Sequence, residues 1–176
     1  MEERKRSLAD KLVLFLAYGF GTGCIPFAPG TFGTAAGFLW IWLLLIPGEI
    51  WIYIGGIVAG FFLAVAIGAR AERILGEKDP GAIVIDEIAA LPLAFLPAVV
   101  ATMVKGEPRE FAFFWQGKAI LLPLLAFALF RLFDIWKPLG IKQSQEVPGG
   151  WGLVIDDFLA AILAATALAV YLVPRN

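Results

Sequence analysis

Histidine is absent from the 176 residues of this sequence, and cysteine occurs once, as Cys24. Without histidine there can be no histidine-based catalytic triad, phosphohistidine intermediate or histidine-type zinc site. A single cysteine excludes both an intramolecular disulfide and a cysteine-cluster metal site. Any bound metal must therefore be held by oxygen atoms, which favour a hard cation such as Mg2+.

Charge is also scarce, with 16% charged residues, a net charge of −1 and no long basic block. This composition gives no electrostatic footprint for nucleic acid, so we exclude that partner. Hydrophobic residues make up 60% of the chain, well above the roughly 45–50% of soluble domains. No linker or repeat divides the sequence, which predicts a single membrane-embedded domain covering residues 1–176, with the lipid bilayer as its surroundings.

The apolar stretches predict an all-α fold, because a membrane-spanning helix needs about 20 mostly apolar residues. A shorter, glycine-rich stretch at residues 12–25 predicts an interfacial or re-entrant helix. The expected fold is a polytopic membrane helical bundle with about five spans plus this short N-terminal helix. The proposed spans are residues 34–46 with their flanks, 50–69, 83–104, 119–136 and 153–173.

The charges divide unevenly between the two sides of such a bundle. If the first segment does not cross, one side holds ten of the fourteen Lys and Arg residues and twelve of the fifteen acids. That side includes residues 26–33, the expected loop 70–81, and residues 131–152. The positive-inside rule makes it the cytoplasmic side.

A glycine-rich segment at residues 19–34 could bind an anion through its backbone amides, especially with Thr31 or Thr34 opening a helix. It is neither a Walker loop nor a dinucleotide fingerprint, since no lysine follows the glycines and no strand precedes them. A turn and helix cap between two membrane segments would explain the same pattern.

Two adjacent acids, Asp86 and Glu87, lie a turn or two inside an apolar run. An ionised carboxylate there costs several kcal/mol unless it is paired, metal-bound or hydrated. Adjacent helical residues project about 100° apart, so both can border one cavity. The alternative is a structural ion pair with Arg70 or Arg131.

Arg131, Asp134 and Lys137 follow one another at intervals of three, which would align them on one side of a helix. Pro138 disfavours helical geometry at Lys137, so we expect the helix to end there. An arginine and a lysine beside an acid suit phosphate recognition. Cations that extend from a helix end toward water are the alternative.

A second acidic pair, Asp156 and Asp157, follows Gly149 and Gly150 at the start of the last apolar helix. The helix dipole would stabilise one acid at this position. Two adjacent acids, with no basic residue within ten positions after them, are better explained by a bound cation. Together with Asp86, Glu87 and Asp134 they lie within about 10 Å of a proposed helix end, at headgroup depth rather than at the midplane typical of transport sites.

At these residues the chain resembles the phosphatidylglycerophosphatase A family. Four motifs in the same order carry the resemblance: residues 29–34, residues 79–80 with 83–87, residues 130–138, and residues 149–150 with 156–157. The resemblance implies Mg2+-dependent hydrolysis of phosphatidylglycerophosphate to phosphatidylglycerol and inorganic phosphate. It also implies a bacterial inner membrane, with the active site facing the cytoplasm.

These observations lead to a hypothesis for the site. The metal ligands would be Asp86, Glu87, Asp156 and Asp157, holding one or two Mg2+ ions. Asp134 completes the catalytic set by orienting the cations or joining the metal site. The metal would stabilise developing charge and activate water, although an aspartyl-phosphate intermediate is an open alternative. The expected substrate-binding residues are Arg131, Lys137, Arg70, Thr31 and Thr34.

Three other functions are compatible with the sequence. A phosphatase for another lipid phosphate would use the same residues, because nothing in them recognises the glycerol headgroup. A small ion-coupled transporter would use the acids as a conduit and would release no phosphate. A non-catalytic membrane scaffold would do neither.

Overall fold

The structure is a computed structural model that describes residues 6–138, 141–144 and 147–173. Within these residues every regular element is a helix, which confirms the predicted all-α class. The α-helices are α1 (Leu8–Ala17), α2 (Pro29–Leu45), α3 (Ile50–Leu75), α4 (Ile85–Lys105), α5 (Leu121–Trp136), α6 (Ile141–Ser144) and α7 (Trp151–Leu172). The 3-10 helices are η1 (Gly19–Cys24), η2 (Phe111–Trp115) and η3 (Gly117–Ile120).

Four of the described helical segments are long and apolar enough to cross a membrane. They are α3, α4, α7 and the continuous segment Gly117–Trp136 formed by η3 and α5. The remaining predicted span belongs to α2, an apolar helix of 17 residues that is about 26 Å long. This is slightly less than the roughly 30 Å of a bilayer core. The chain is a multi-pass membrane protein.

One predicted boundary is wrong. Residues 70–81 were expected to form a loop, but α3 continues to Leu75, so Arg70 and Arg73 lie on the helix. Residues 69–73 are alanine, arginine and glutamate, which are good helix formers. Their helix propensity outweighs the polarity that suggested a loop. The helix stops only at Gly76, whose left-handed conformation (φ 70°) caps it. With 26 residues, α3 is about 39 Å long and extends beyond the hydrocarbon.

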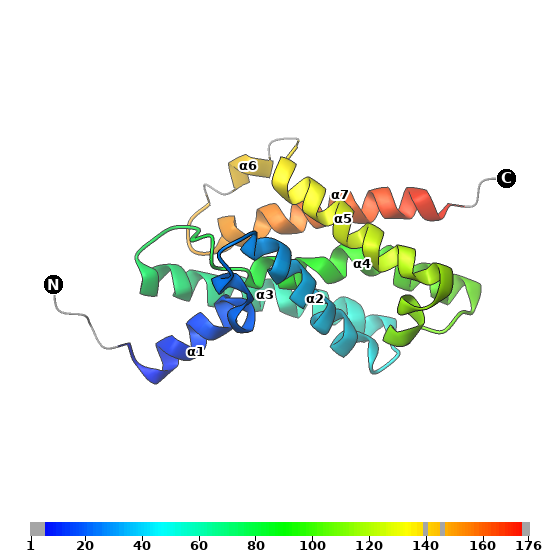
Figure 1. The fold of residues 1–176 in the computed structure, drawn as a ribbon, viewed down its shortest axis with the longest axis horizontal. Helices are drawn as coiled ribbons and strands as arrows, with labels where there is room; N and C mark the ends of the chain where they lie inside the picture. The colour runs from blue at the N-terminus through cyan, green and yellow to red at the C-terminus, as the bar shows by residue number, and fades with distance from the viewer. Residues whose placement is uncertain (1–5, 139–140, 145–146, 174–176) are drawn as a thin grey trace.

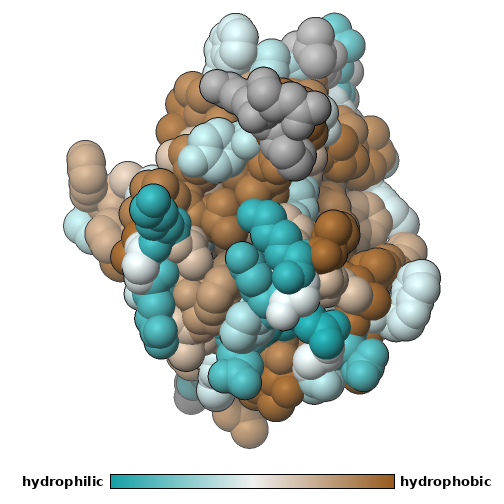
Figure 2. Space-filling model, turned by 90° about the vertical axis from the view of Figure 1, so that its right-hand side faces the viewer, coloured by the Kyte–Doolittle hydropathy of each residue, from teal (hydrophilic) through white to brown (hydrophobic). Residues whose placement is uncertain are grey.

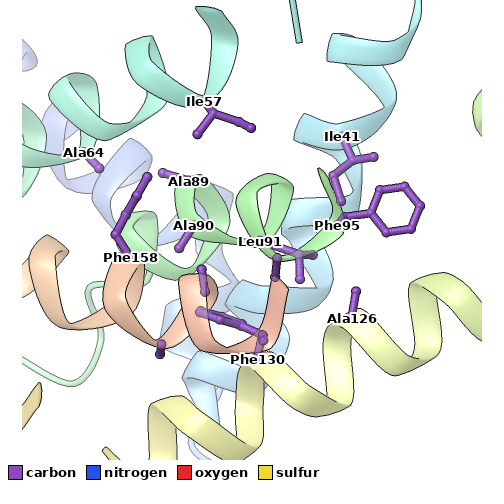
Figure 3. Close-up of a cluster of buried hydrophobic side chains, with 14 of the residues drawn as sticks. Ile41, Ile57, Ala64, Ala89, Ala90, Leu91, Phe95, Ala126, Phe130 and Phe158 are labelled. Carbon is purple, nitrogen blue, oxygen red and sulfur yellow. The ribbon is translucent and has the colours of Figure 1, made fainter. Parts of the chain in front are cut away.

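Helix α4 occupies the middle of the bundle, where it packs against α2, α3, α5 and α7 (Figure 1). Small residues allow this close packing, as in other membrane bundles. Gly37 of α2 illustrates it, because a Cβ atom there would lie 3.1 Å from Leu91 of α4. Figure 3 shows α4 side chains surrounded by those of its neighbours: Ala89, Ala90, Leu91 and Phe95 with Ile41, Ile57, Ala64, Ala126, Phe130 and Phe158.

The N-terminal segment packs against the start of α4. Helix α1 has ten residues, about 15 Å, which is too short to cross a bilayer. Its last residue, Ala17, accepts a hydrogen bond at 2.9 Å from the Val84 amide, directly before α4. In η1, a Cβ atom on Gly23 would lie 2.0 Å from the Ala82 carbonyl oxygen, so only glycine fits. The predicted interfacial position of this segment stays a prediction.

Charged residues at the end of the molecule where α2 joins α3 and α4 joins α5 are largely on the surface. Figure 2 shows hydrophilic side chains standing among hydrophobic ones at this end. The exposed charged residues here are Glu49, Lys105, Glu107, Glu110 and Lys118. The five predicted site acids lie at the opposite end, where α4 and α7 begin and α5 ends.

Candidate active site

Three helices bring the five predicted site acids to one end of the bundle. Asp86 and Glu87 lie in the first turn of α4. Asp156 and Asp157 are the sixth and seventh residues of α7, which begins at Trp151, two residues earlier than predicted. Asp134 lies in the last turn of the antiparallel helix α5. All except Glu87 are buried, and Glu87 is half-buried.

Three of these acids are close enough to share a metal ion. One carboxylate oxygen from each of Asp86, Glu87 and Asp157 lies within 4.8 Å of the others. We call these three residues the carboxylate triad. Two oxygens on opposite sides of one Mg2+ ion lie about 4.2 Å apart at its usual bond length, so small side-chain movements would bring the triad onto one ion.

The burial of the triad supports this assignment. Asp86 is 5% exposed and Asp157 is 3% exposed. Asp86 Oδ1, Glu87 Oε2 and Asp157 Oδ2 are buried and accept no hydrogen bond from the described residues. Buried carboxylate oxygens that lack a hydrogen-bond donor and lie close together are costly unless a cation compensates their charge. The oxygen-only donor set fits a hard divalent ion such as Mg2+.

Beside the triad, five residues alternate in charge. Arg131 Nη1 lies 3.7 Å from Glu87 Oε1 and 2.6 Å from Asp134 Oδ2. Lys137 Nζ lies 3.5 Å from Asp134 Oδ1 and donates to Asp156 Oδ2. The alternating charge chain Glu87–Arg131–Asp134–Lys137–Asp156 therefore links α4, α5 and α7.

Lys137 reaches Asp134 and Asp156 because α5 ends just before it. This helix end was predicted from Pro138. Lys137 is the C-cap residue, with φ 44° and ψ 57°, and its amide donates to Phe133 O at 2.7 Å. This left-handed conformation is uncommon for lysine and redirects the chain at the helix end. Burial lowers the pKa of Lys137, but its hydrogen bond to Asp156 and the nearby acids raise the pKa above its ordinary value overall. The ammonium stays protonated.

The start of α2 packs against one side of the alternating charge chain. Thr34 Oγ1 donates to Gly30 O at 2.8 Å and accepts from Arg131 Nη1 at 3.4 Å. A Cβ atom on Gly30 would lie 2.3 Å from Glu87 Oε1 and 3.1 Å from Arg131 Nη1. The glycine-rich segment thus approaches the charged residues closely. Gly30 makes this close approach, which could not be singled out from the sequence.

Four of the five predicted substrate-binding residues lie near the acids, and Arg70 does not. Arg131 and Lys137 border the acids, and half-buried Thr31 lies next to Gly30. Thr34 is fully buried and contacts Arg131. Arg70 is not brought to the acids: its Nη2 donates to Asp10 Oδ1 of α1 at 2.8 Å. That hydrogen bond lowers the pKa of Asp10. Of the two ion-pair partners considered for Asp86 and Glu87, Arg131 is the one that contacts Glu87.

Asp79, in the loop before α4, also belongs to this neighbourhood. Its amide donates to Glu72 Oε1 at 3.0 Å and its backbone is left-handed, with φ 50°. Burial raises its pKa, while the charge of Lys137 lowers it and those of Glu72 and Asp134 raise it further. In the sequence, the only signal for Asp79 is its place directly before Pro80 within one of the four motifs.

Comparison with known proteins identifies the family of this chain. The family model described as Phosphatidylglycerophosphatase A matches residues 15–172. A Haemophilus influenzae protein named Phosphatidylglycerophosphatase A is 36% identical over 164 residues, covering 92% of this chain and 88% of the relative. An Escherichia coli protein of the same name is 29% identical over 155 residues, covering 87% and 79%.

A third relative has a different name. This protein of Bacteroides thetaiotaomicron, provisionally named a phosphatidylinositol-3-phosphatase, is 33% identical over 163 residues, covering 90% of this chain and 92% of the relative. No solved structure matches the chain significantly.

Proposed function

The chain belongs to the phosphatidylglycerophosphatase A family of lipid phosphatases, and we propose that it hydrolyses phosphatidylglycerophosphate to phosphatidylglycerol and inorganic phosphate with Mg2+. The observation that carries this proposal is the carboxylate triad, which is buried at Asp86 and Asp157, half-buried at Glu87, and lies beside Arg131 and Lys137. Oxygen ligands for a divalent cation and positive groups for a phosphate are the two requirements of metal-assisted phosphoryl transfer.

In this proposal, Asp86, Glu87 and Asp157 hold the Mg2+ ion. When bound, the ion supplies charge stabilisation and an activated water molecule. Arg131 and Lys137 bind the oxygens of the terminal phosphate, and Asp134 fixes the orientation of both cations through its two oxygens. Hydrolysis transfers the water oxygen to phosphorus, breaks the bond from phosphorus to the glycerol oxygen, and leaves a proton on that oxygen.

The depth of the site suits a lipid substrate. Asp157 lies six residues after the start of α7, about 9 Å along the helix, and Asp134 lies two residues before the end of α5. A phosphate at the membrane surface can therefore reach the acids while its acyl chains stay in the bilayer. The substrate need not leave the membrane.

We further propose that the site faces the cytoplasm of a bacterium from its inner membrane. The excess of Lys and Arg on the site end supports this orientation. The native Cys24 offers a test, because it is exposed at the site end of the molecule. A membrane-impermeant maleimide should label Cys24 in inside-out vesicles and leave it unlabelled in intact cells. The reverse pattern would contradict the orientation.

The direct test of function is phosphate release from phosphatidylglycerophosphate by the purified protein. We expect turnover with Mg2+, loss of turnover with a chelator, and recovery when Mg2+ is restored. Asp157→Asn should be inactive, while Glu110→Gln, an exposed acid at the opposite end, should retain activity. Equal turnover with and without the chelator, or a fully active and folded Asp157→Asn variant, would overturn the proposal.

The name of the Bacteroides relative supports a second candidate substrate, phosphatidylinositol 3-phosphate. Arg131, Lys137 and the triad would bind the terminal phosphate of either lipid in the same way. Side-by-side measurement of kcat/KM for the two lipids distinguishes them. A higher value for the inositol lipid would replace the proposed substrate and keep the reaction class.

A further inference from the structure

We propose that the resting site of this enzyme binds one divalent cation, because the Lys137 ammonium occupies the position where the remaining acids would otherwise bind a second. This inference rests on the proposed function and deepens it. It divides the five acids into two groups with different counter-charges. The carboxylate triad has a metal ion, whereas Asp134 and Asp156 have cations supplied by the protein.

One oxygen of each triad residue lacks a hydrogen-bond donor among the described residues. Asp86 and Asp157 are more than nine-tenths buried, and Asp86 Oδ1 and Asp157 Oδ2 receive no hydrogen bond from the described residues. Glu87 also has one buried oxygen, Oε2, without a donor, although Arg131 lies near its other oxygen. The protein supplies no counter-charge directly at these three oxygens, so the triad requires an external cation.

The other two acids, Asp134 and Asp156, have positively charged partners within the protein. Lys137 Nζ donates to Asp156 Oδ2 and lies 3.5 Å from Asp134 Oδ1, so the ammonium lies between two carboxylates from different helices. Asp134 Oδ2 has a further partner, Arg131 Nη1, at 2.6 Å. A divalent ion bridging Asp134 and Asp156 would have to displace the ammonium or lie against it, and like charges in a buried setting repel strongly.

The net charge of the site limits the number of divalent ions that it can bind. Five carboxylates and two basic side chains leave three negative charges, and a single divalent ion reduces these to one. If Lys137 loses its charge, four negative charges remain, and two divalent ions neutralise them. Lys137 thus determines how many ions the acids accommodate. An ammonium has three donors, and the hydrogen bond to Asp156 uses one of them, so Lys137 can also donate to a phosphate oxygen.

The test is the number of Mn2+ ions bound by the purified protein, measured by equilibrium dialysis and by electron paramagnetic resonance. We expect one ion per chain in the wild type. Asp157→Asn should weaken its binding by at least about 100-fold, since removal even of residues that only orient ligands costs about 10–100-fold. Asp156→Asn should retain one ion, with an affinity within about tenfold of the wild type.

Lys137 variants complete the test. Lys137→Met should bind a second Mn2+ ion, whereas Lys137→Arg keeps the positive charge and should bind one. Two ions in the wild type would overturn the inference, as would loss of Mn2+ binding in Asp156→Asn equal to that in Asp157→Asn. If Lys137→Met does not fold, these two comparisons still decide the question.

The inference and the proposed function fail in different ways. A folded wild-type protein that binds no Mn2+ and releases phosphate in the presence of a chelator would remove the metal from the proposed function. Two bound ions together with Mg2+-dependent turnover would leave the function intact and overturn only the single-ion assignment.

Discussion

The two ends of the bundle treat charged side chains in opposite ways. Where α2 meets α3 and α4 meets α5, Glu49, Glu107 and Glu110 lie in turns or loops, Lys118 lies in η3, and all four are exposed to solvent. At the other end, Asp86, Asp134, Asp156 and Asp157 are buried within helices. Water solvates the exposed charges of the first end, so these side chains need no partner within the protein. The second set needs particular counter-charges, because a buried charge without one costs several kcal/mol.

This contrast predicts which acids affect catalysis. Asp86→Asn removes a triad carboxylate, and we expect kcat/KM for phosphate release to fall by at least about 100-fold, since a catalytic metal supplies several kcal/mol. Glu107→Gln makes the same chemical change at the exposed end and should leave kcat/KM unchanged. Comparable losses in both variants would show that burial does not distinguish functional acids here.

Backbone access to the site can be tested with a pair of glycine substitutions. In Gly30→Ala the new Cβ would collide with Glu87 Oε1, so we expect kcat/KM to fall about 10-fold or more as that carboxylate is displaced. Gly55→Ala in α3 places its Cβ in open space, with no atom within 4 Å. That variant should keep full activity. Unchanged kinetics for Gly30→Ala would contradict the close approach of α2.

Metal binding should also be visible in stability. A cation that binds only the folded protein stabilises it by about 2.7 kcal/mol when its concentration is 100 times the Kd. We therefore expect Mg2+ to raise the Tm measured in detergent, and a chelator to reverse the rise. Asp157→Asn should lose this Mg2+ dependence and should melt higher than the wild type in chelator, because it removes one of several mutually repelling charges. A Mg2+-dependent rise of equal size in Asp157→Asn would contradict the triad.

A smaller effect is expected for Thr34, which lies behind Arg131. Thr34→Val removes a hydrogen bond worth about 1 kcal/mol and the oxygen that accepts from Arg131. We expect kcat/KM to fall several-fold, by up to about 10-fold. Thr166→Val removes a similar bond, to Ile162 O on the exposed surface of α7, and serves as a control. If both variants behave alike in the kinetic assay, Thr34 has no positioning role.

The smallest effect should come from the exposed ion pair between Asp10 and Arg70. Because Arg70 lowers the pKa of Asp10, the pair stabilises the fold above the unfolded-state pKa of Asp10, and this contribution is lost as pH falls through the folded-state value. Exposed pairs contribute little. We therefore expect Asp10→Asn to change neither kcat/KM nor the Tm at pH 7 measurably. A large loss of activity would restore the predicted role of Arg70 in substrate binding.

The sequence predicted the elements better than it predicted the partners. Long apolar runs determine α3, α4 and α7, and the alternation of sides then brings Asp86, Asp134 and Asp157 to one end. The pairing of Lys137 with Asp156 could not be predicted, since all four acids of the two pairs were expected to bind metal. It depends on the left-handed backbone at Lys137. Contacts across helices, such as Gly30 with Glu87, have no signature in local spacing.

The position of the charges within their helices has a consequence for membrane insertion. Asp86 and Glu87 fall in the first turn of α4, and Asp156 and Asp157 in the second turn of α7. Helix α4 therefore keeps 17 uncharged residues after Glu87, and α7 keeps 15 after Asp157. Each nascent helix can enter the bilayer with its acids at the hydrated boundary. A charge there costs much less free energy than one at the bilayer centre. The acids become buried only when the helices associate, so insertion can precede assembly of the site.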